Sequence, residues 1–290
     1  SKYGYDITKM ESPHIPIKNL KNPSFALFGT LKGLLNQKHY DVVHAFNVPS
    51  AFAMRYIEAT KKVLSVHGVF SEQVKTLHSN TVSSIASTAE KKVLKWADKL
   101  TTDSKLSQRK YKEQGYDFVY LPSAIDTTMF LQIPKVEKKQ NQVVYIGRDS
   151  YEKGIDLLKN AESKINGKVI YCTDKQWPDA MKILRESSVL VVPSRMESLP
   201  TIIKEAFFLK TPVVATNVGG IPELIVDNET GILVEPNNTD ELAKSVNTIL
   251  DDANFSNKLT NQAHDFVIKN MTWDTVLPSY VQFYEKLVSN

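Results

Sequence analysis

The chain has 290 residues, of which 42% are hydrophobic and 23% charged, and its formal net charge is +4. This length predicts two domains of ordinary globular composition, and no window approaches the roughly 20 apolar residues that a membrane-spanning helix needs. The single cysteine, Cys172, excludes an internal disulfide and a cysteine-based zinc site, as is typical of a reducing cytosol. We therefore expect a cytoplasmic protein that does not span a membrane.

Short β-rich runs alternate with helical patterns along the whole chain, which predicts parallel sheets covered by helices in an α/β fold. The strands expected in the first half are residues 5–8, 41–46, 62–67, 99–102 and 118–121. Those expected in the second half are residues 142–146, 168–172, 189–192, 212–216 and 231–234. Each half is therefore predicted to form a Rossmann-like domain.

Residues 133–142 are polar and charged, carry a proline and lack apolar periodicity, which predicts a linker. We accordingly expect a first domain of residues 1–138 and a second of residues 139–272. Residues 273–290 are expected to form a C-terminal helix that packs back towards the first domain. Two helix starts are also predicted, one by a capping box of Asn238 and Glu241, the other by Pro222 and Glu223 after Gly219 and Gly220.

Charge is divided unevenly between the two halves. Residues 1–142 carry 21 Lys and Arg against 12 Asp and Glu, a net charge of +9, whereas residues 143–290 carry 15 against 20, a net charge of −5. Lysines and an arginine recur at helical spacing within residues 91–112, and such a face can meet anionic lipid headgroups or an anionic acceptor. Solvated helix faces are the alternative interpretation. Nucleic acid is not expected as a partner, because no aromatic-interleaved basic motif or zinc-finger spacing occurs.

Polar side chains follow the expected strands of the second half where each strand ends, which is where open α/β sheets bind ligands. Gly147 and Arg148 follow residues 142–146, and Lys153 comes five residues after the arginine. Glycine lets the backbone approach a ligand, a guanidinium can grip a diphosphate through two hydrogen bonds, and a lysine adds a point charge. These residues predict a diphosphate site, with solvated surface charges as the alternative.

Two glutamates, Glu197 and Glu205, lie where the buried run of residues 189–194 gives way to a helix that opens at Pro200. The free backbone N–H groups and the dipole of a helix N-terminus attract phosphate. Carboxylates beside that terminus can hold sugar hydroxyls, so the pair predicts a nucleotide-sugar site. A helix cap and a surface charge are the alternative interpretation.

Together these residues resemble the family-four (group 1) retaining glycosyltransferases, which have the GT-B fold. The match is strong from residue 143 to about residue 250, and it includes residues 143–148, 152–154, 193–206, 211–223 and 230–234. In the first half, residues 41–44, 66–68, 97–104 and 121–130 fall in the family's order. The resemblance implies two Rossmann-like domains that face each other across a cleft.

The resemblance also implies roles for individual residues. Arg148 and Lys153 would bind the donor diphosphate, Glu197 the sugar hydroxyls and Glu205 the nucleotide ribose. His67 would face the reaction centre from the first domain, and a strand-end histidine satisfied by backbone is the alternative. The implied catalytic residues are His67, Arg148, Lys153 and Glu197. The implied donor-binding residues are Gly147, Arg148, Lys153, Glu197, Ser198, Leu199, Pro200, Thr201 and Glu205.

The implied activity is hexosyl transfer from a nucleoside-diphosphate sugar to a hydroxyl of a glycan or a lipid-linked acceptor, with retention of configuration. The sequence contains no Asp-x-Asp motif, in keeping with the metal-independent habit of GT-B enzymes, so we expect no metal and no cofactor beyond the donor. With the basic first half, this implies a cytoplasmic enzyme that is peripheral at the inner face of the membrane. The alternatives are a non-catalytic nucleotide-sugar-binding or scaffold protein and a GT-B-like epimerase, which needs further acid/base residues.

The sequence departs from the family pattern in three places. Only four residues precede the first expected strand, so the first domain looks shortened by an opening strand, a glycine-rich loop and a helix. Between Gly147 and Glu197 one strand-and-helix unit that helps contact the nucleotide base is also missing. Finally, Ser198, Leu199 and Pro200 replace a glycine-rich triplet, and proline has no N–H to donate, so a tighter sugar pocket is expected.

Overall fold

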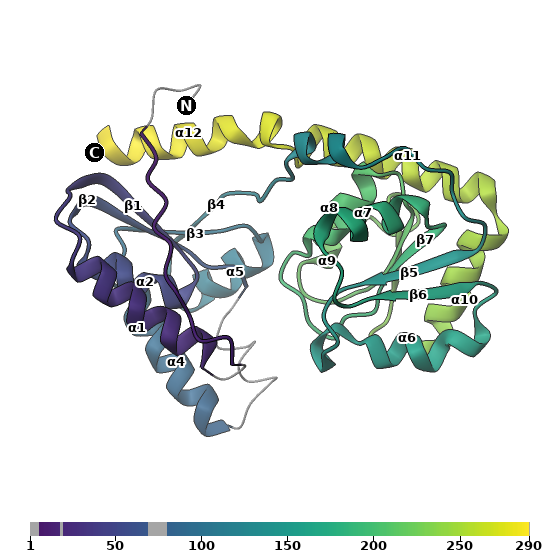
Figure 1. The fold of residues 1–290 in the computed structure, drawn as a ribbon, viewed down its shortest axis with the longest axis horizontal. Helices are drawn as coiled ribbons and strands as arrows, with labels where there is room; N and C mark the ends of the chain where they lie inside the picture. The colour runs from purple at the N-terminus through teal and green to yellow at the C-terminus, as the bar shows by residue number, and fades with distance from the viewer. Residues whose placement is uncertain (1–5, 18–19, 69–79, 290) are drawn as a thin grey trace. The chain divides into compact units, whose positions relative to one another are not determined.

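A computed structural model of the chain describes residues 6–17, 20–68 and 80–289. Its contacts divide the chain into two units, whose elements are labelled in Figure 1. The first unit comprises residues 1–102, 115–119 and 283–290, and the second comprises residues 103–114 and 120–282. Each unit contains a parallel sheet, as the α/β prediction required. The predicted domain boundaries after residues 138 and 272 remain predictions.

The first unit is built on a four-stranded sheet in the order β1-β2-β3-β4. The strands are β1 (Tyr40–Phe46), β2 (Ala59–Ser65), β3 (Lys99–Thr102) and β4 (Phe118–Tyr120). Four of the five strands expected here are thus present, each within three residues of its expected bounds. The strand expected at residues 5–8 is wrong: residues 6–8 are exposed and pair with no strand in the described part of the chain, and Tyr5 lies outside it.

Helices α1 (Lys21–Leu34), α2 (Val48–Tyr56) and α4 (Asn80–Leu94) complete the first unit. The first two helices pack through small residues, because a Cβ added at Gly33 would lie 2.7 Å from the carbonyl oxygen of Ala53. Helix α12 (Trp273–Ser289) contributes its last residues to this unit. There the hydroxyl of Tyr284 lies 2.5 Å from Nδ1 of His44.

The second unit is built on a five-stranded parallel sheet in the order β6-β5-β7-β8-β9. The strands are β5 (Gln142–Ile146), β6 (Lys168–Cys172), β7 (Val189–Val192), β8 (Val213–Thr216) and β9 (Ile232–Val234). Three of them have the predicted bounds, and the other two start one residue later. These runs were recognisable because strands buried on both faces are continuously apolar.

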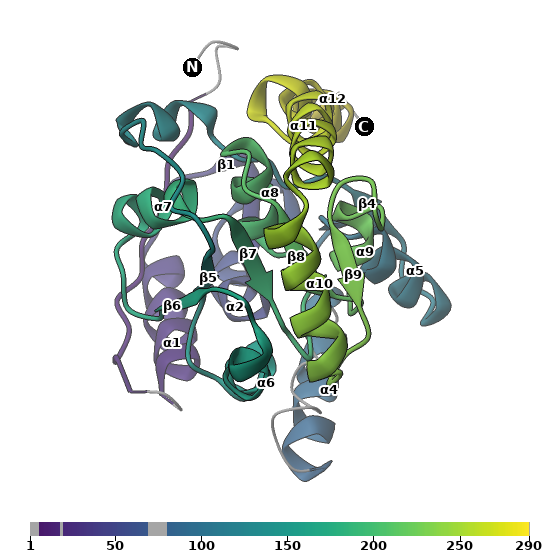
Figure 2. The same ribbon diagram turned by 90° about the vertical axis from the view of Figure 1, so that its right-hand side faces the viewer.

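Helices cover both faces of this sheet (Figure 2). They are α6 (Ile155–Ala161), α7 (Trp177–Glu186), α8 (Thr201–Phe208), α9 (Ile221–Leu224), α10 (Thr239–Asp251) and α11 (Ala253–Asn270). Helix α5 (Lys105–Glu113) and the short 3₁₀ turns η1 (Thr127–Gln132), η2 (Tyr151–Lys153) and η3 (Glu162–Lys164) also belong to this unit. The predicted cap of α10 is confirmed, since the side-chain oxygen of Asn238 accepts the N–H of Glu241 at 3.1 Å. The helix predicted at Pro222 is also present as α9.

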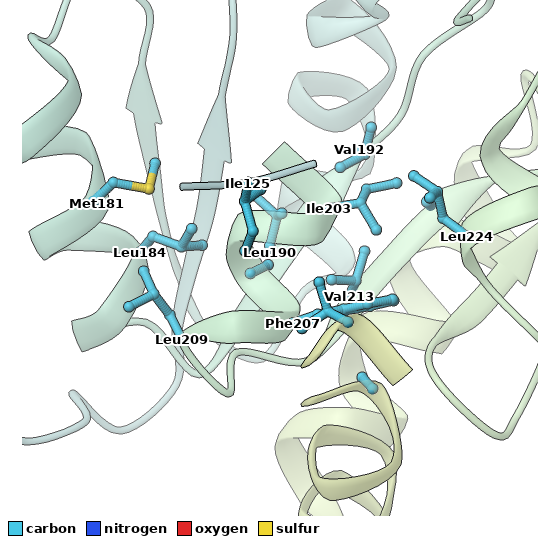
Figure 3. Close-up of a cluster of buried hydrophobic side chains, with 14 of the residues drawn as sticks. Ile125, Met181, Leu184, Leu190, Val192, Ile203, Phe207, Leu209, Val213 and Leu224 are labelled. Atoms are coloured by element: carbon cyan, nitrogen blue, oxygen red, sulfur yellow. The ribbon is translucent and has the colours of Figure 1, made fainter. Parts of the chain in front are cut away.

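Helix α8 is anchored by the core on one face of the second sheet (Figure 3). Ile203 and Phe207 of α8 are at most 1% exposed and pack in one cluster with Leu190 and Val213 of the strands. Each such side chain contributes about 1.5–3 kcal/mol when it is fully buried. This packing fixes the end of β7 and the start of α8, where polar site residues were predicted. No helix in the described residues is long and apolar enough to cross a bilayer.

Candidate functional site

Three loops of the second unit leave the carboxyl ends of neighbouring strands. They comprise residues 147–154 after β5, residues 193–200 after β7 and residues 217–220 after β8. Because β7 pairs with both β5 and β8 in parallel, the three loops emerge at one edge of the sheet. Most of the predicted site residues are therefore on adjoining loops.

Glycines bring these loops into backbone contact. At Gly154 (φ +64°) a Cβ would lie 1.9 Å from the carbonyl oxygen of Pro193, and at Gly219 (φ +57°) it would lie 1.8 Å from that of Glu197. Any side chain would therefore clash with backbone, and the left-handed conformation also favours glycine. The loop after β7 is thus held between its two neighbours in a single arrangement.

Lys153 and Glu197, both predicted site residues, form an ion pair. The ammonium group of Lys153 lies 2.6 Å from Oε1 of Glu197, and the hydroxyl of Ser194 donates to the same oxygen at 3.0 Å. The side chain of Glu197 is only 10% exposed and that of Lys153 is 26% exposed. The pair is therefore shielded from water, which strengthens its electrostatic interaction with any ligand.

Arg148 is more exposed than this pair. Its side chain is 76% exposed and donates to Glu152 Oε1 at 3.1 Å, while its carbonyl accepts the hydroxyl of Tyr145 at 2.7 Å. No hydrogen bond joins Arg148 to Lys153 or Glu197 within the described residues. Gly147 lies close to Tyr145, since a Cβ there would be 3.0 Å from the phenolic oxygen. The structure thus holds the backbone of this loop and leaves the guanidinium in solvent.

The start of α8 offers hydrogen-bond donors without intrahelical partners. Pro200 occupies the N-cap position, and no side chain caps the helix. Leu199 is buried, Thr201 is exposed, and the hydroxyl oxygen of Ser198 is buried without a hydrogen-bond partner among the described residues. Free N–H groups and the dipole at such an end favour a bound anion, and the loop that leads into α8 also carries Glu197, the partner of Lys153.

Arg195 is a site-forming residue that the sequence did not reveal. Its guanidinium donates to both carboxylate oxygens of Asp156, at 2.7 and 2.6 Å, and lies 4.2 Å from the centre of the Tyr151 ring. The Arg195 hydrogen bond lowers the pKa of Asp156. Arg195 therefore clamps the loop after β7 onto the start of α6. The two partners are 39 residues apart, so no local pattern signals the pair.

Family models match both halves of the chain. Residues 127–252 match a family model described as glycosyl transferases group 1, and residues 2–129 match one described as glycosyltransferase family 4. An uncharacterized glycosyltransferase of Methanocaldococcus jannaschii is 23% identical, over 97% of this chain and 87% of its own. The chain belongs to the group 1 glycosyltransferases.

Solved structures of other proteins share the fold of this chain. Sucrose-phosphate synthase from Thermosynechococcus elongatus superposes with a TM-score of 0.77 and 19% identity, over 92% of this chain and 78% of its own. HepE of Anabaena, solved in complex with UDP-glucose, gives a TM-score of 0.70 and 16% identity, over 92% and 82%. The predicted GT-B fold is thereby confirmed.

In this glycosyltransferase, Glu205 is engaged by a residue that the sequence did not single out. Oε1 of Glu205 accepts the indole N–H of Trp177 at 2.7 Å. Burial raises the pKa of the Glu205 carboxyl, while the Trp177 hydrogen bond and the nearby charge of Lys204 oppose that rise. The predicted contact of Glu205 with the ribose remains a prediction.

His67 belongs to the first unit, whereas the other predicted site residues belong to the second. It lies two residues beyond the end of β2, with its ring 6.4 Å from that of Phe46 and nearly parallel to it. Its catalytic role therefore remains a prediction. His44 has hydroxyl partners at both ring nitrogens, and burial lowers its pKa to about 4.

A metal centre is not evident in the described part of the chain. Within residues 6–17, 20–68 and 80–289, no three His, Cys, Asp or Glu side chains gather where they could hold an ion. Independence of metal remains a prediction, because a donor diphosphate can itself supply metal ligands.

Proposed function

We propose that this group 1 glycosyltransferase moves a hexosyl group from a nucleoside-diphosphate sugar to a hydroxyl of a glycan or a lipid-linked acceptor, with retention of configuration and without a metal. The observation that carries the proposal is the shielded Lys153–Glu197 ion pair beside the uncapped start of α8. A diphosphate needs cationic and N–H donors, whereas sugar hydroxyls need an acceptor. The two loops supply both at one edge of the sheet.

A donor can bind without breaking the ion pair. An ammonium group carries three N–H donors, so Lys153 can keep Glu197 while it donates to a phosphate oxygen. Glu197 has a second carboxylate oxygen for a sugar hydroxyl, since both contacts described above use Oε1. Arg148, which lies in solvent on the neighbouring loop, reaches the diphosphate by changing its rotamer. The donor complex of Anabaena HepE with UDP-glucose supports this class of donor.

In the proposed reaction, the bond between the anomeric carbon and the diphosphate oxygen breaks, and the leaving diphosphate keeps the electron pair. The acceptor oxygen bonds to the same face of the anomeric carbon, and its proton passes to the leaving phosphate oxygen. Lys153, Arg148 and the start of α8 stabilise the charge that grows on the diphosphate. Donors arranged in advance for such charge contribute about 3–4 kcal/mol each in other enzymes.

The direct test is nucleoside diphosphate release from a panel of nucleotide sugars, with and without sugar and lipid acceptors. We expect one donor to be turned over, and Glu197→Ala, Lys153→Ala and Arg148→Ala each to slow release by about 10²-fold or more. Lys164→Ala is the matched control, because it removes another lysine of the same unit from an ion pair, that with Asp240. If Glu197→Ala or Arg148→Ala leaves nucleoside diphosphate release unchanged, the proposed function is contradicted.

The same assay separates the non-catalytic alternative. A nucleotide sugar that binds tightly and is never turned over identifies a binding or scaffold protein. The anomeric configuration of the product, read by nuclear magnetic resonance, tests retention. Activity that survives a chelator supports metal independence, and activity that is lost and restored by a divalent cation contradicts it.

We further propose that the protein works in the cytoplasm against the inner face of an anionic membrane. Support comes from the net charge of +9 in residues 1–142 and from exposed lysines near the end of α4, Lys91, Lys92, Lys95 and Lys99. Such a cluster attracts anionic lipid by about 1 kcal/mol per lysine, and salt weakens the attraction. Sedimentation with anionic liposomes should exceed that with neutral ones at low salt. Equal binding to anionic and neutral liposomes would contradict the proposed membrane association.

A further inference from the structure

The hydrogen bond between Trp177 and Glu205 joins two helices at the predicted donor side of the second unit. Trp177 is the first residue of α7, which follows the carboxyl end of β6, and Glu205 lies in α8, which follows the carboxyl end of β7. The indole N–H meets Oε1 of Glu205 at 2.7 Å, a short distance typical of a bond to a charged acceptor. Neither the Lys153–Glu197 pair nor the Arg195 clamp requires this bond.

The indole ring is held in place by aromatic packing. Phe130 meets it edge to face, with ring centres 5.1 Å apart and planes at 73°, and Phe130 also packs on Phe208 at 4.6 Å. Phe208 is the last residue of α8, the helix that carries Glu205. Trp177 is therefore connected to α8 twice, through its N–H and through Phe130. The direction of the N–H bond is fixed by the core and not by the carboxylate alone.

The bond leaves Glu205 with one oxygen to offer. No hydrogen bond to Oε2 of Glu205 occurs within the described residues, while Oε1 is occupied by Trp177. The neighbouring cation is directed elsewhere, since the ammonium group of Lys204 donates to Ser123 Oγ at 2.7 Å and to the Ser123 carbonyl at 3.2 Å. Glu205 is half-buried, and its second oxygen keeps its capacity to accept a hydrogen bond, so this arrangement suits a ligand hydroxyl.

We propose that Trp177 is a positioning residue of the donor site, which fixes Glu205 so that its second oxygen accepts a ribose hydroxyl of a ribonucleoside-diphosphate sugar. The inference rests on the proposed function and adds a partner for Glu205. It also assigns a selectivity, because a site built to bond a hydroxyl disfavours the analogue that lacks it. Removing the indole N–H should therefore reduce discrimination between ribose and deoxyribose more than it reduces binding of the diphosphate.

The test uses Trp177→Phe, which keeps an aromatic ring and removes the N–H donor. Binding of UDP, ADP and GDP is compared with binding of their 2′,3′-dideoxy analogues by isothermal titration calorimetry. We expect the native protein to prefer the ribonucleotide by about 10- to 100-fold, the usual range for a hydrogen bond to a charged group. Trp177→Phe should lower that preference several-fold while binding of the dideoxy analogue stays the same. Trp96→Phe makes the same chemical change in the first unit and should alter neither value.

Glu205→Gln completes the comparison. We expect it to lower the ribose preference as well, and the double variant with Trp177→Phe to lose little more, because the tryptophan acts through the glutamate. The pH profile gives a second readout. Loss of the N–H donor removes an interaction that favours the ionised carboxylate, so ribonucleotide binding by Trp177→Phe should begin to weaken at a higher pH than in the native protein.

The possible outcomes separate the two proposals. If the native protein binds no nucleoside diphosphate, the proposed function and this inference both fail. If it prefers ribonucleotides and Trp177→Phe keeps the full preference and pH profile, only the inference fails. If Trp177→Phe weakens ribonucleotides and dideoxy analogues equally, the tryptophan has only a structural role and the inference is again overturned.

Discussion

Helices α1 and α10 belong to different units and use their apolar residues in opposite ways. In α10 of the second unit, Val246 and Ile249 are at most 3% exposed. In α1 of the first unit, Leu27, Leu31 and Leu34 are 59%, 48% and 56% exposed. Helix α1 packs on α2 through glycines, whose missing side chains allow the backbones to approach. An apolar pattern thus marks core in the second unit, whereas in the first it also marks surface.

The largest effect on stability is expected in the core cluster of the second unit that anchors α8. Phe207 is 1% exposed and lies in the cluster that anchors α8. Phe207→Ala should lower the free energy of unfolding of the second unit by about 3–5 kcal/mol, because burial is lost and a cavity remains. Urea unfolding followed by circular dichroism measures this, with Leu131→Ala, at an 86% exposed leucine of the same unit, as the control. A loss below about 1 kcal/mol would contradict the packing described here.

A second effect distinguishes the units by pH. Burial lowers the pKa of His44 in the first unit from 6.5 to about 4, so between these values the unfolded chain binds a proton that the folded unit does not. Acidification should therefore destabilise the first unit by up to about 1.4 kcal/mol per pH unit, or about 3 kcal/mol in all. Unfolding free energies measured between pH 7.5 and pH 4 test this. His44→Gln should flatten the slope, and an unchanged slope would show that other groups cause it.

Glu205 in the second unit works in the opposite direction. Burial raises the pKa of its carboxyl above the ordinary value, so the folded unit holds a proton at pH values where the unfolded chain has released it. Acidification through that range stabilises the second unit relative to the first. The pH experiment thus sharpens the comparison, because one buried group in each unit responds with opposite sign.

A smaller effect concerns the start of α5, which the contacts group with the second unit. The carboxylate of Glu223 accepts the hydroxyl of Ser104 at 2.7 Å and the backbone N–H groups of Lys105 and Leu106 at 2.8 Å. Glu223→Ala should cost about 1–2 kcal/mol, as for the loss of other helix caps. Hydrogen exchange of α5 amides should rise in this variant. If the amides of residues 105–106 keep their protection from hydrogen exchange, water replaces the Glu223 cap without loss of helix stability.

The sequence predicted the second sheet well because its signals are local. The run at residues 189–192 is continuously apolar, and residues before and after it have turn or cap chemistry, so β7 and the start of α8 could be placed closely. The sequence also singled out Lys153 and Glu197, since each follows a recognisable strand, and the structure joins them in an ion pair. Residues 6–8 show the limit of this approach, because a strand needs a neighbour that an alternating pattern does not supply.

Other features depend on partners far apart in the chain. Arg195 meets Asp156 across 39 residues, Trp177 meets Glu205 across 28, and the fully buried Lys204 meets Ser123 across 81. No periodicity encodes such pairs, so only the folded structure reveals the Arg195 clamp and the Trp177 contact. One feature of the first unit did have a local signal. Gly29 and Gly33 lie one helical turn apart, the spacing of small residues that brings two helices together.

The smallest effect on stability is expected at the leucines of α1. Their side chains already lie in water in the folded unit, and glutamine has nearly the same helix propensity as leucine. Leu31→Gln should therefore change the free energy of unfolding by no more than about 0.5 kcal/mol, whereas Val246→Gln in α10 should cost several times as much because it buries an unpaired amide. Leu27→Gln, Leu31→Gln and Leu34→Gln combined should also lower binding of a hydrophobic dye, since exposed apolar patches bind such dyes. If Leu31→Gln instead costs about as much as Val246→Gln, the α1 leucines are covered in solution. Both units would then bury their apolar helix faces, and they would differ only in what covers those faces. Measuring the loss of unfolding free energy caused by Leu31→Gln at low and at high protein concentration would show whether a second copy of the chain covers α1.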